Sequence, residues 1–234
     1  MIELVTFDAA GTLLEYRSTP GALAARMARE RGYDLSDEAG EALFQRIESS
    51  LRREREEAEK ARDRVRVRAV WLKMAEEWLR QTDGAPERAS DWLDEFLERM
   101  FAGEGGGFAP YEDAAPTLRE LREAGIRVGV LSNWDHTLHL VLKRTGLEEL
   151  LDFAIASLEF GVEKPDPAIF EEALRQGGAS PRTALHVGDD FADDYEGAKK
   201  AGWHALLLER SAKASTNGTI RSLTEVSERI RQWT

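Results

Sequence analysis

The stretch Val5-Thr6-Phe7-Asp8-Ala9-Ala10-Gly11-Thr12-Leu13-Leu14 joins a short apolar run to a turn that carries a single carboxylate. Asp8 is therefore expected where a buried strand ends, with its side chain projecting from the carboxyl edge of a sheet. Open α/β sheets bind their ligands at this edge. The stretch predicts an α/β fold with a functional site at Asp8.

Further apolar runs occur later in the chain. They are rich in branched residues and bounded by Gly, Asp, Glu or Asn, which is typical of buried strands in a parallel sheet. Helical patterns lie between them, and Gly125, Gly146, Gly177 and Gly202 follow these patterns, where a helix C-cap favours glycine. The alternation predicts a Rossmann-like, doubly wound parallel sheet. The predicted strands are residues 4–7, 126–131, 153–156, 183–187 and 205–208, and the predicted helices are residues 115–124, 137–145, 167–176 and 194–201.

One long segment, residues 16–106, interrupts this alternation. It has almost no strand pattern and is dense in Glu, Arg, Ala, Leu and Trp, while Leu43, Ile47 and Leu51 recur at helical spacing. The glycine-rich stretch 103–107 marks the return to the sheet. We therefore expect two domains: a core of residues 1–15 and 107–234, and an inserted all-helical cap of residues 16–106.

Composition narrows the classes of function. The net charge of −12 argues against a general affinity for nucleic acid or an anionic membrane, because both partners would be repelled. The absence of cysteine excludes disulfides and thiolate metal sites. No apolar run approaches the ~20 residues that cross a bilayer, and no secretory signal pattern is visible. We expect a cytoplasmic protein that acts on a small molecule.

Three polar motifs are expected at the same sheet edge as Asp8. Ser132-Asn133 ends the second core strand, Lys164-Pro-Asp-Pro167 precedes a helix, and a run from His186 to Asp194 ends the fourth. The carboxyl ends of parallel strands meet at one edge, so these motifs can share a crevice. Taken together and in this order, they resemble the haloacid dehalogenase (HAD) superfamily, and the resemblance covers essentially the whole chain outside the cap.

The resemblance implies a Rossmann-like core with a C1-type cap and a nucleophile at Asp8. A carboxylate can attack phosphorus and form an acyl phosphate, which divides one displacement into two. Because nucleophile and phosphate are both negative, a cation is needed between them. Asp8, Asp189 and the backbone carbonyl of Ala10 supply the oxygen ligands that Mg²⁺ prefers.

The resemblance also implies phosphoryl-binding groups. Ser132 and the amide of Asn133 would donate to a phosphoryl oxygen, while Lys164 would neutralise charge on the nucleophile and the phosphate. Asp194 would support the metal through water or hold Lys164, and it is assigned with Asp8 and Lys164 to catalysis. Two neighbouring carboxylates are further candidates for the supporting role, Asp190 and Asp193.

In HAD phosphatases the first motif has the sequence Asp-x-Asp-Gly-Thr, and Ala10 stands at the position of its second Asp. In those phosphatases that residue is the general acid/base, a role usually worth roughly 10² to 10⁴ in rate. A phosphatase without it would need substrates with good leaving groups or another carboxylate, such as Asp135 or Glu15. This is the preferred hypothesis: slow or selective Mg²⁺-dependent hydrolysis of a small phosphorylated metabolite.

Three alternatives stay open. Haloacid dehalogenases also lack the second Asp, because halide leaves unassisted, but their fourth motif does not ordinarily carry the Gly-Asp-Asp at residues 188–190. Phosphonate-cleaving relatives place Ala at the position of Ala10 and need a cap lysine, for which Lys60 and Lys73 are the only candidates. The last alternative is a regulatory protein that binds Mg²⁺ and phosphate with little turnover.

The closest resemblance within the superfamily is to the HAD-like hydrolase domain-containing subgroup, also called REG-2-like. It rests on Ser132-Asn133 followed by an aromatic residue and Asp135, on Lys164-Pro-Asp-Pro before Ile169-Phe170, and on His186-Val-Gly-Asp189. This subgroup also replaces the second Asp of the first motif. This resemblance implies the fold and the site residues, but it does not indicate which substrate the protein acts on.

Overall fold

The computed structural model describes the chain except residues 62, 83, 103–105 and 233–234, and except the side chain of Lys60. The chain forms two compact units, one of Met1–Glu15 with Pro110–Thr234 and one of Tyr16–Ala109. Part of the predicted glycine-rich return at 103–107 lies outside the described residues. Within the described residues, each helix is too short or too polar to span a membrane.

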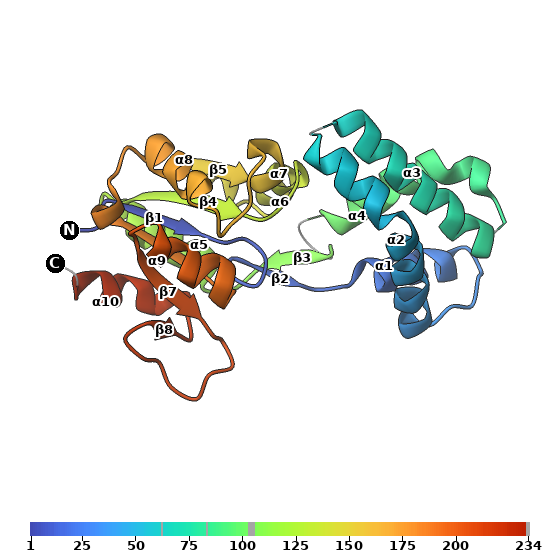
Figure 1. The fold of residues 1–234 in the computed structure, drawn as a ribbon. Helices are drawn as coiled ribbons and strands as arrows, with labels where there is room; N and C mark the ends of the chain where they lie inside the picture. The colour runs from blue at the N-terminus through green and yellow to red at the C-terminus, as the bar shows by residue number, and fades with distance from the viewer. Residues whose placement is uncertain (62, 83, 103–105, 233–234) are drawn as a thin grey trace. The chain divides into compact units, whose positions relative to one another are not determined.

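The first unit contains a parallel sheet of six strands in the order β5-β4-β1-β6-β7-β8 (Figure 1). β1 lies at the point where the strand order reverses, with β4 on one side and β6 on the other. The α/β class and the Rossmann-like sheet predicted from sequence are confirmed. The strands are β1 (Leu4–Phe7), β4 (Arg127–Ser132), β5 (Phe153–Ala156), β6 (Ala184–Gly188), β7 (His204–Leu208) and β8 (Thr219–Ile220).

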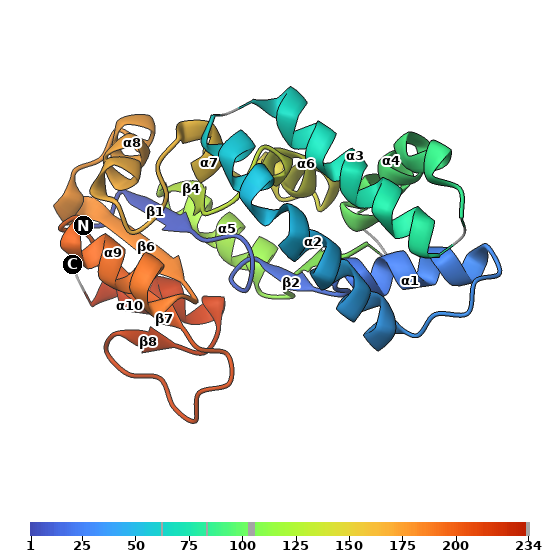
Figure 2. The same ribbon diagram turned by 45° about the vertical axis from the view of Figure 1, so that its right-hand side comes forward.

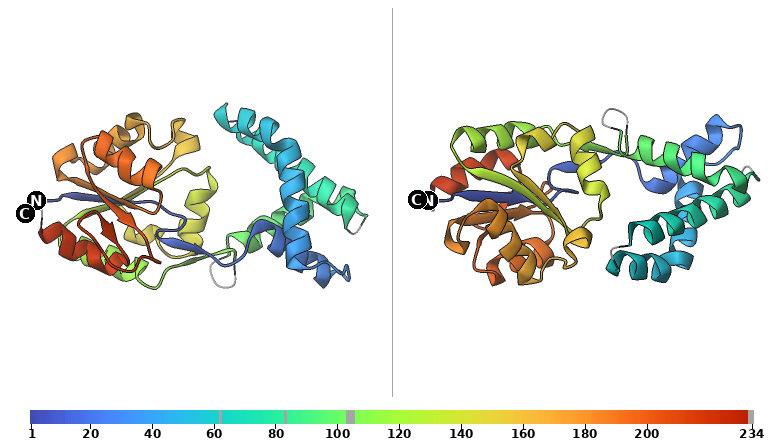
Figure 3. Two further views of the ribbon diagram at one scale, coloured as in Figure 1. Left: turned by 60° about the horizontal axis from the view of Figure 1, so that its bottom comes forward. Right: turned by 90° about the horizontal axis from the view of Figure 1, so that it is seen from above.

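Helices cover both faces of this sheet. Figure 3 shows α8 and α9 on one face and α5 and α10 on the other, which makes the sheet doubly wound. The helices of this unit are α5 (Ala114–Glu123), α6 (Thr137–Arg144), α7 (Ser157–Phe160), α8 (Pro167–Gly177), α9 (Gly197–Lys200) and α10 (Val226–Arg231), with short turns η2 (Glu148–Leu150), η3 (Pro181–Thr183) and η5 (Leu223–Glu225).

The structure corrects two details of the helix prediction. The helix predicted over residues 194–201 begins as a π-helical turn, η4 (Phe191–Glu196), before α9. The C-cap of α8 is Gly178, with φ of 55°, and not Gly177. Gly177 is glycine for a packing reason, because a Cβ there would lie 2.6 Å from Cδ2 of Leu4.

A hydrophobic core cluster lies between the sheet and α8. Phe170 is fully buried and makes edge-to-face contacts with His186 and Trp203, at centroid distances of 5.7 and 5.6 Å. Leu4, Leu131 and Ile155 bring three neighbouring strands into the same cluster. This packing fixes α8, and therefore the loop before it, against the strands that carry the candidate site.

The second unit is a bundle of helices in which α2 and α3 lie side by side (Figure 2). Side-chain caps start its first three helices, because Thr19, Ser36 and Asp63 accept hydrogen bonds from backbone amides of the first turn. Trp92 stacks on Trp78 and on Phe96 in its interior. The helices are α1 (Pro20–Glu30), α2 (Asp37–Lys60), α3 (Arg64–Gln81), η1 (Pro86–Arg88) and α4 (Ala89–Met100), and the short strands β2 (Leu14–Tyr16) and β3 (Phe108–Pro110) pair where the chain passes between the units.

The packing role of Gly177 can be tested with two alanine variants. Gly177→Ala is expected to destabilise the protein by about 1–3 kcal/mol by overpacking against Leu4. Gly125→Ala is expected to cost about 1–2 kcal/mol through its positive φ alone. Urea unfolding in a Leu4→Ala background separates the two causes: the penalty at Gly177 should shrink and that at Gly125 should persist. An undiminished penalty at Gly177 would refute the packing explanation.

Candidate active site

Three neighbouring strand ends form the candidate site. Asp8 directly follows β1, Ser132 is the last residue of β4, and Asp189 directly follows β6. Because β1 lies between β4 and β6, the three residues converge at the point where strand order reverses, the usual ligand site of an open α/β sheet. Asp8 and Ser132 are buried.

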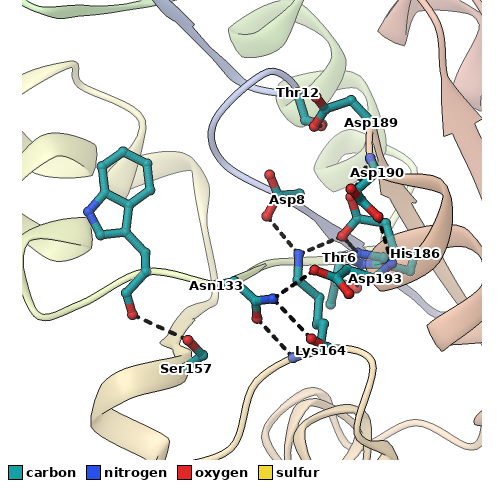
Figure 4. Close-up of polar contacts among 12 residues, drawn as sticks. Thr6, Asp8, Thr12, Asn133, Ser157, Lys164, His186, Asp189, Asp190 and Asp193 are labelled. Atoms are coloured by element: carbon teal, nitrogen blue, oxygen red, sulfur yellow. Dashed lines mark hydrogen bonds and ion pairs between the residues drawn. The ribbon is translucent and has the colours of Figure 1, made fainter. Parts of the chain in front are cut away.

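Lys164 connects this edge to the loop before α8. Its ammonium group donates to Asp8 Oδ1 at 2.7 Å and to Asp194 Oδ1 at 2.5 Å, and the residue is only 4% exposed. Figure 4 shows the ammonium pointing at Asp8 from the opposite side of the site. One buried cation therefore joins the nucleophile candidate to the π-helical turn after β6.

Asp194 has both carboxylate oxygens occupied by protein donors. Oδ1 accepts from Lys164 and is 3.1 Å from His186 Nε2, while Oδ2 accepts from the backbone amide of Asp190 at 3.0 Å. A Cβ at Gly188 would lie 2.1 Å from Asp194 Oδ2, so the glycine makes room for this carboxylate. Of the two roles predicted for Asp194, its contacts match that of holding Lys164.

His186 extends the network into the sheet. Because the Asp194 carboxylate can only accept, His186 Nε2 carries the proton, and Nδ1 accepts from the Thr6 hydroxyl at 2.8 Å. Sequence reasoning treated His186 only as part of a motif and overlooked Thr6. The available signal was a polar residue within each of two otherwise apolar strands, and β1–β6 register pairs these residues directly.

Asn133 uses its side chain to hold the Lys164 loop. Its Oδ1 accepts from the backbone amide of Lys164 at 2.8 Å, and its Nδ2 donates to the Lys164 carbonyl at 3.0 Å and to Asp193 Oδ2 at 3.2 Å. This two-way clamp was not predicted. Phosphoryl binding by the backbone amide of Asn133 stays a prediction.

The carboxylates suit a hard cation. Oxygen atoms of Asp8, Asp189 and Asp194 all lie within 4.8 Å of one another, and all-oxygen ligand sets favour Mg²⁺. Thr12 donates its hydroxyl to Asp189 Oδ1 at 3.2 Å. Gly11, with φ of 78°, brings the loop so close that a Cβ would lie 2.2 Å from Asp189 Oδ2. The residues therefore fit the predicted metal.

Burial and mutual charge set the titration of the site. Burial raises the pKa of Asp8, against the opposing effects of Lys164 and of a hydrogen bond from Ser132. Burial would lower the pKa of Lys164, but its two carboxylate partners outweigh burial and raise it. Asp194 is also desolvated, yet Lys164 and His186 lower its pKa overall. Burial and the charge of Asp8 raise the pKa of Asp189.

Two of the other predicted carboxylates, Asp135 and Asp190, have local structural contacts. Asp135 Oδ1 accepts from the amide and hydroxyl of Thr137, the first residue of α6, at 2.8 and 2.6 Å. Asp190 caps the π-helical turn by accepting from the amides of Ala192 and Asp193. Glu15, the other candidate acid, belongs to β2 and to the first unit.

The lysines proposed for imine chemistry are in the helical unit. Lys73 donates to Glu54 at 2.5 Å, with about half of each side chain exposed. The side chain of Lys60 lies outside the described residues. The contacts of Lys73 are those of a surface ion pair.

A family model described as haloacid dehalogenase-like hydrolase matches residues 2–202. The chain belongs to this family. The human haloacid dehalogenase-like hydrolase domain-containing protein 3 is 32% identical over 207 residues, covering 88% of this chain and 82% of the relative. The Drosophila melanogaster rhythmically expressed gene 2 protein is 29% identical, covering 90% and 84%. The predicted HAD subgroup is confirmed.

Two further proteins similar to this chain are named for an enzymatic activity. Glyceraldehyde 3-phosphate phosphatase of Methanopyrus kandleri is 36% identical over 107 residues, covering 43% of this chain and 44% of the relative. The crystal structure of 2-haloacid dehalogenase from Pseudomonas syringae pv. tomato superposes with a TM-score of 0.68 at 27% identity, covering all of both chains. Both phosphatases and dehalogenases thus resemble this HAD-like hydrolase.

Replacing Lys164 tests how much its buried ammonium group contributes to the stability of the fold. Lys164→Met leaves the carboxylates of Asp8 and Asp194 facing each other, so the free energy of unfolding should fall by about 3–5 kcal/mol at pH 7. The carboxylate pKa values in the folded variant then rise. The variant therefore binds protons on folding, and its deficit should narrow from pH 7 to pH 5.

Guanidinium unfolding at both pH values measures this deficit. Lys143→Met, which changes an exposed lysine on α6, is the matched control and should alter stability by no more than about 0.5 kcal/mol. A deficit at Lys164 that is as small as the control's, or that stays constant with pH, would contradict the buried-bridge account.

Proposed function

We propose that this HAD-like hydrolase is a Mg²⁺-dependent phosphatase of small phosphorylated metabolites that works through an aspartyl phosphate on Asp8. The observation that carries the proposal is the grouping of the Asp8, Asp189 and Asp194 carboxylates within 4.8 Å, with the ammonium of Lys164 between Asp8 and Asp194. A dianionic phosphoryl group needs such positive charge beside a carboxylate nucleophile. The phosphatase relative adds support.

In the first step the Asp8 carboxylate attacks phosphorus. The new bond joins an Asp8 oxygen to phosphorus, and the bond between phosphorus and the leaving-group oxygen breaks with its electron pair on that oxygen. Lys164 holds Asp8 Oδ1, which leaves Oδ2 as the attacking atom. Ser132 lies beside Asp8 and would donate to a phosphoryl oxygen, as would the backbone amide of Asn133.

In the second step water attacks phosphorus, the bond between phosphorus and Asp8 breaks, and inorganic phosphate leaves. The methyl group of Ala10 can neither protonate the leaving oxygen in the first step nor take the proton from water in the second. Both protons then exchange with solvent. The chemistry therefore favours substrates whose leaving group is stable as an anion.

Asp8, Asp189 and the carbonyl of Ala10 are the residues proposed to hold Mg²⁺, which when bound would offset the charge between the carboxylates and the phosphoryl group. Asp194 acts through Lys164, because its own oxygens are taken by protein donors. The unit of residues Tyr16–Ala109 is proposed as the cap that selects the substrate.

A second candidate function is hydrolysis of a 2-haloacid. It is favoured by Ala10, since halide needs no acid to leave, and by the 27% identity to a 2-haloacid dehalogenase. In that reaction Asp8 would displace halide from carbon and form an ester. The three grouped carboxylates argue against it, because a halide ion needs no divalent cation to depart.

Phosphate and halide release can be measured side by side. With 4-nitrophenyl phosphate, wild-type protein should release phosphate only when Mg²⁺ is present, and Asp8→Asn should reduce the rate by at least about 10³-fold while the variant still unfolds in one cooperative transition. With 2-chloropropionate, neither protein should release chloride. Metal-independent chloride release that needs Asp8 would establish the second candidate, and silence in both assays would reject both activities.

The absence of an acid at position 10 predicts a steep dependence on the leaving group. Across aryl and alkyl phosphates, the wild-type rate should fall sharply as leaving-group pKa rises. Ala10→Asp should accelerate alkyl phosphates by roughly 10²-fold or more and change 4-nitrophenyl phosphate little, because only poor leaving groups need a proton. A shallow wild-type dependence would point to an acid supplied by another residue, and Ala10→Ser controls for a polar side chain without acidity.

A further inference from the structure

Arg210 contacts the rear of the loop that carries Asp8. Arg210 follows β7, and both of its terminal nitrogens donate hydrogen bonds to the Asp113 carboxylate. Nη1 lies 2.9 Å from Oδ2, and Nη2 lies 3.0 Å from Oδ1. Nη2 also donates to the backbone carbonyl of Thr12 at 2.9 Å. The guanidinium carbon Cζ lies over the Tyr111 ring, 3.6 Å from its centroid. One side chain therefore makes three kinds of contact at once.

Asp113 is itself held in place. Its Oδ2 also accepts from the Ser222 hydroxyl at 2.8 Å and from the Leu223 amide at 2.9 Å. Burial would raise its pKa, but these donors and Arg210 lower it overall, so the carboxylate stays charged opposite the guanidinium. Arg210 is thus anchored to a fixed acceptor and not to a mobile surface acid.

The loop side of this contact leads directly to the site. Thr12 is fully buried, with its carbonyl bound by Arg210 and its hydroxyl donated to Asp189 Oδ1 at 3.2 Å. The next residue is held as well, because the Tyr111 amide donates to the Leu13 carbonyl at 2.9 Å. Arg210 and Tyr111 therefore fix the two residues that follow Gly11, where an added Cβ would lie 2.2 Å from Asp189 Oδ2.

We propose that Arg210 is a positioning residue for the metal site: through Thr12 it sets the placement of the Asp8–Thr12 loop against Asp189. This inference rests on the proposed Mg²⁺-dependent function. The Ala10 carbonyl and Asp8 belong to this loop, and Asp189 lies across from it, so a shift of the loop changes the spacing of all three proposed ligands. Partners outside the ligand set commonly contribute 10- to 100-fold to metal affinity.

Lysine cannot replace the guanidinium here. Its single ammonium cannot donate to two carboxylate oxygens and the Thr12 carbonyl in a fixed plane while stacking on Tyr111. Among the described residues, Arg210 Nε is buried without a hydrogen-bond partner. The orientation of the side chain is therefore set by its terminal nitrogens, which Arg210→Lys removes while keeping the charge.

The test is Mg²⁺ binding to the full chain without substrate, by isothermal titration calorimetry. Arg210→Lys should weaken Mg²⁺ affinity about tenfold or more. Arg127→Lys is the matched control, because Arg127 Nη2 also donates to a backbone carbonyl, that of Gly178, at the opposite end of β4 from the site. Its Mg²⁺ affinity should equal that of the wild type, even if its thermal midpoint falls.

Steady-state rates supply a second readout. For Arg210→Lys, the Mg²⁺ concentration at half-maximal rate should rise about tenfold, while kcat at saturating Mg²⁺ stays within about threefold of wild type. A merely structural role would lower the thermal midpoint without moving the Mg²⁺ dependence. If Arg210→Lys does not fold, Asp113→Asn, which keeps the side-chain shape and loses the charge, should show the same direction of change.

The outcomes separate the two proposals. Wild-type protein that does not bind Mg²⁺ rejects the proposed function and this inference with it. Wild-type protein that binds Mg²⁺, together with a folded Arg210→Lys or Asp113→Asn variant of unchanged affinity, rejects the role of Arg210 alone and leaves the proposed function standing.

Discussion

The ammonium of Lys164 is held between two buried carboxylates, and the rest of the site depends on this contact. A buried lysine is strongly disfavoured unless opposite charge and hydrogen bonds compensate the lost hydration. Asp8 and Asp194 provide that compensation. In return, the contact binds three segments that are far apart in the sequence: the end of β1, the loop before α8 and the turn after β6.

Each of these segments has a local structure that brings its side chain to the contact. The π-helical turn starts with the Asp190 cap and directs Asp194 toward Lys164, in the space left by Gly188. Asn133 clamps the backbone of Lys164 from β4. π-Helical turns are rare and are frequently found at functional sites. In a HAD-like hydrolase, this arrangement places a fixed cation beside the proposed nucleophile before any substrate arrives.

The sequence was most informative where short-range pattern and function coincide. Apolar runs predicted the strands of the six-stranded sheet except β8, which is only two residues long, and motif order predicted that Asp8, Lys164 and Asp189 meet at one edge. Contacts set by long-range register were not predictable. The hydrogen bond between Thr6 and His186 requires knowledge that β1 pairs with β6. The hydrogen bonds from Arg210 to Asp113 and Thr12 likewise join segments that are far apart in the sequence, and no sequence pattern indicates that they are in contact.

Local ambiguity explains the remaining differences. Gly177 and Gly178 both suit the end of α8, and the fold distinguishes them, because Gly178 takes the positive φ while Gly177 packs against Leu4. Asp135 follows the Ser132-Asn133 motif and was a candidate acid, but a carboxylate two residues before Thr137 serves equally well as an acceptor for the first residue of α6. For such residues the sequence is compatible with two roles, and only their contacts in the folded protein show which role each one has.

The central claim is that Asp8 accepts a phosphoryl group while Lys164 and the neighbouring carboxylates keep their places. A crystal structure with Mg²⁺ and beryllofluoride, which mimics an aspartyl phosphate, tests it most directly. The account predicts beryllium on Asp8 Oδ2, Mg²⁺ on Asp8, Asp189 and the Ala10 carbonyl, and Lys164 still bound to Asp194. Beryllofluoride on another residue, or Mg²⁺ bound without Asp8 and Asp189, would contradict it.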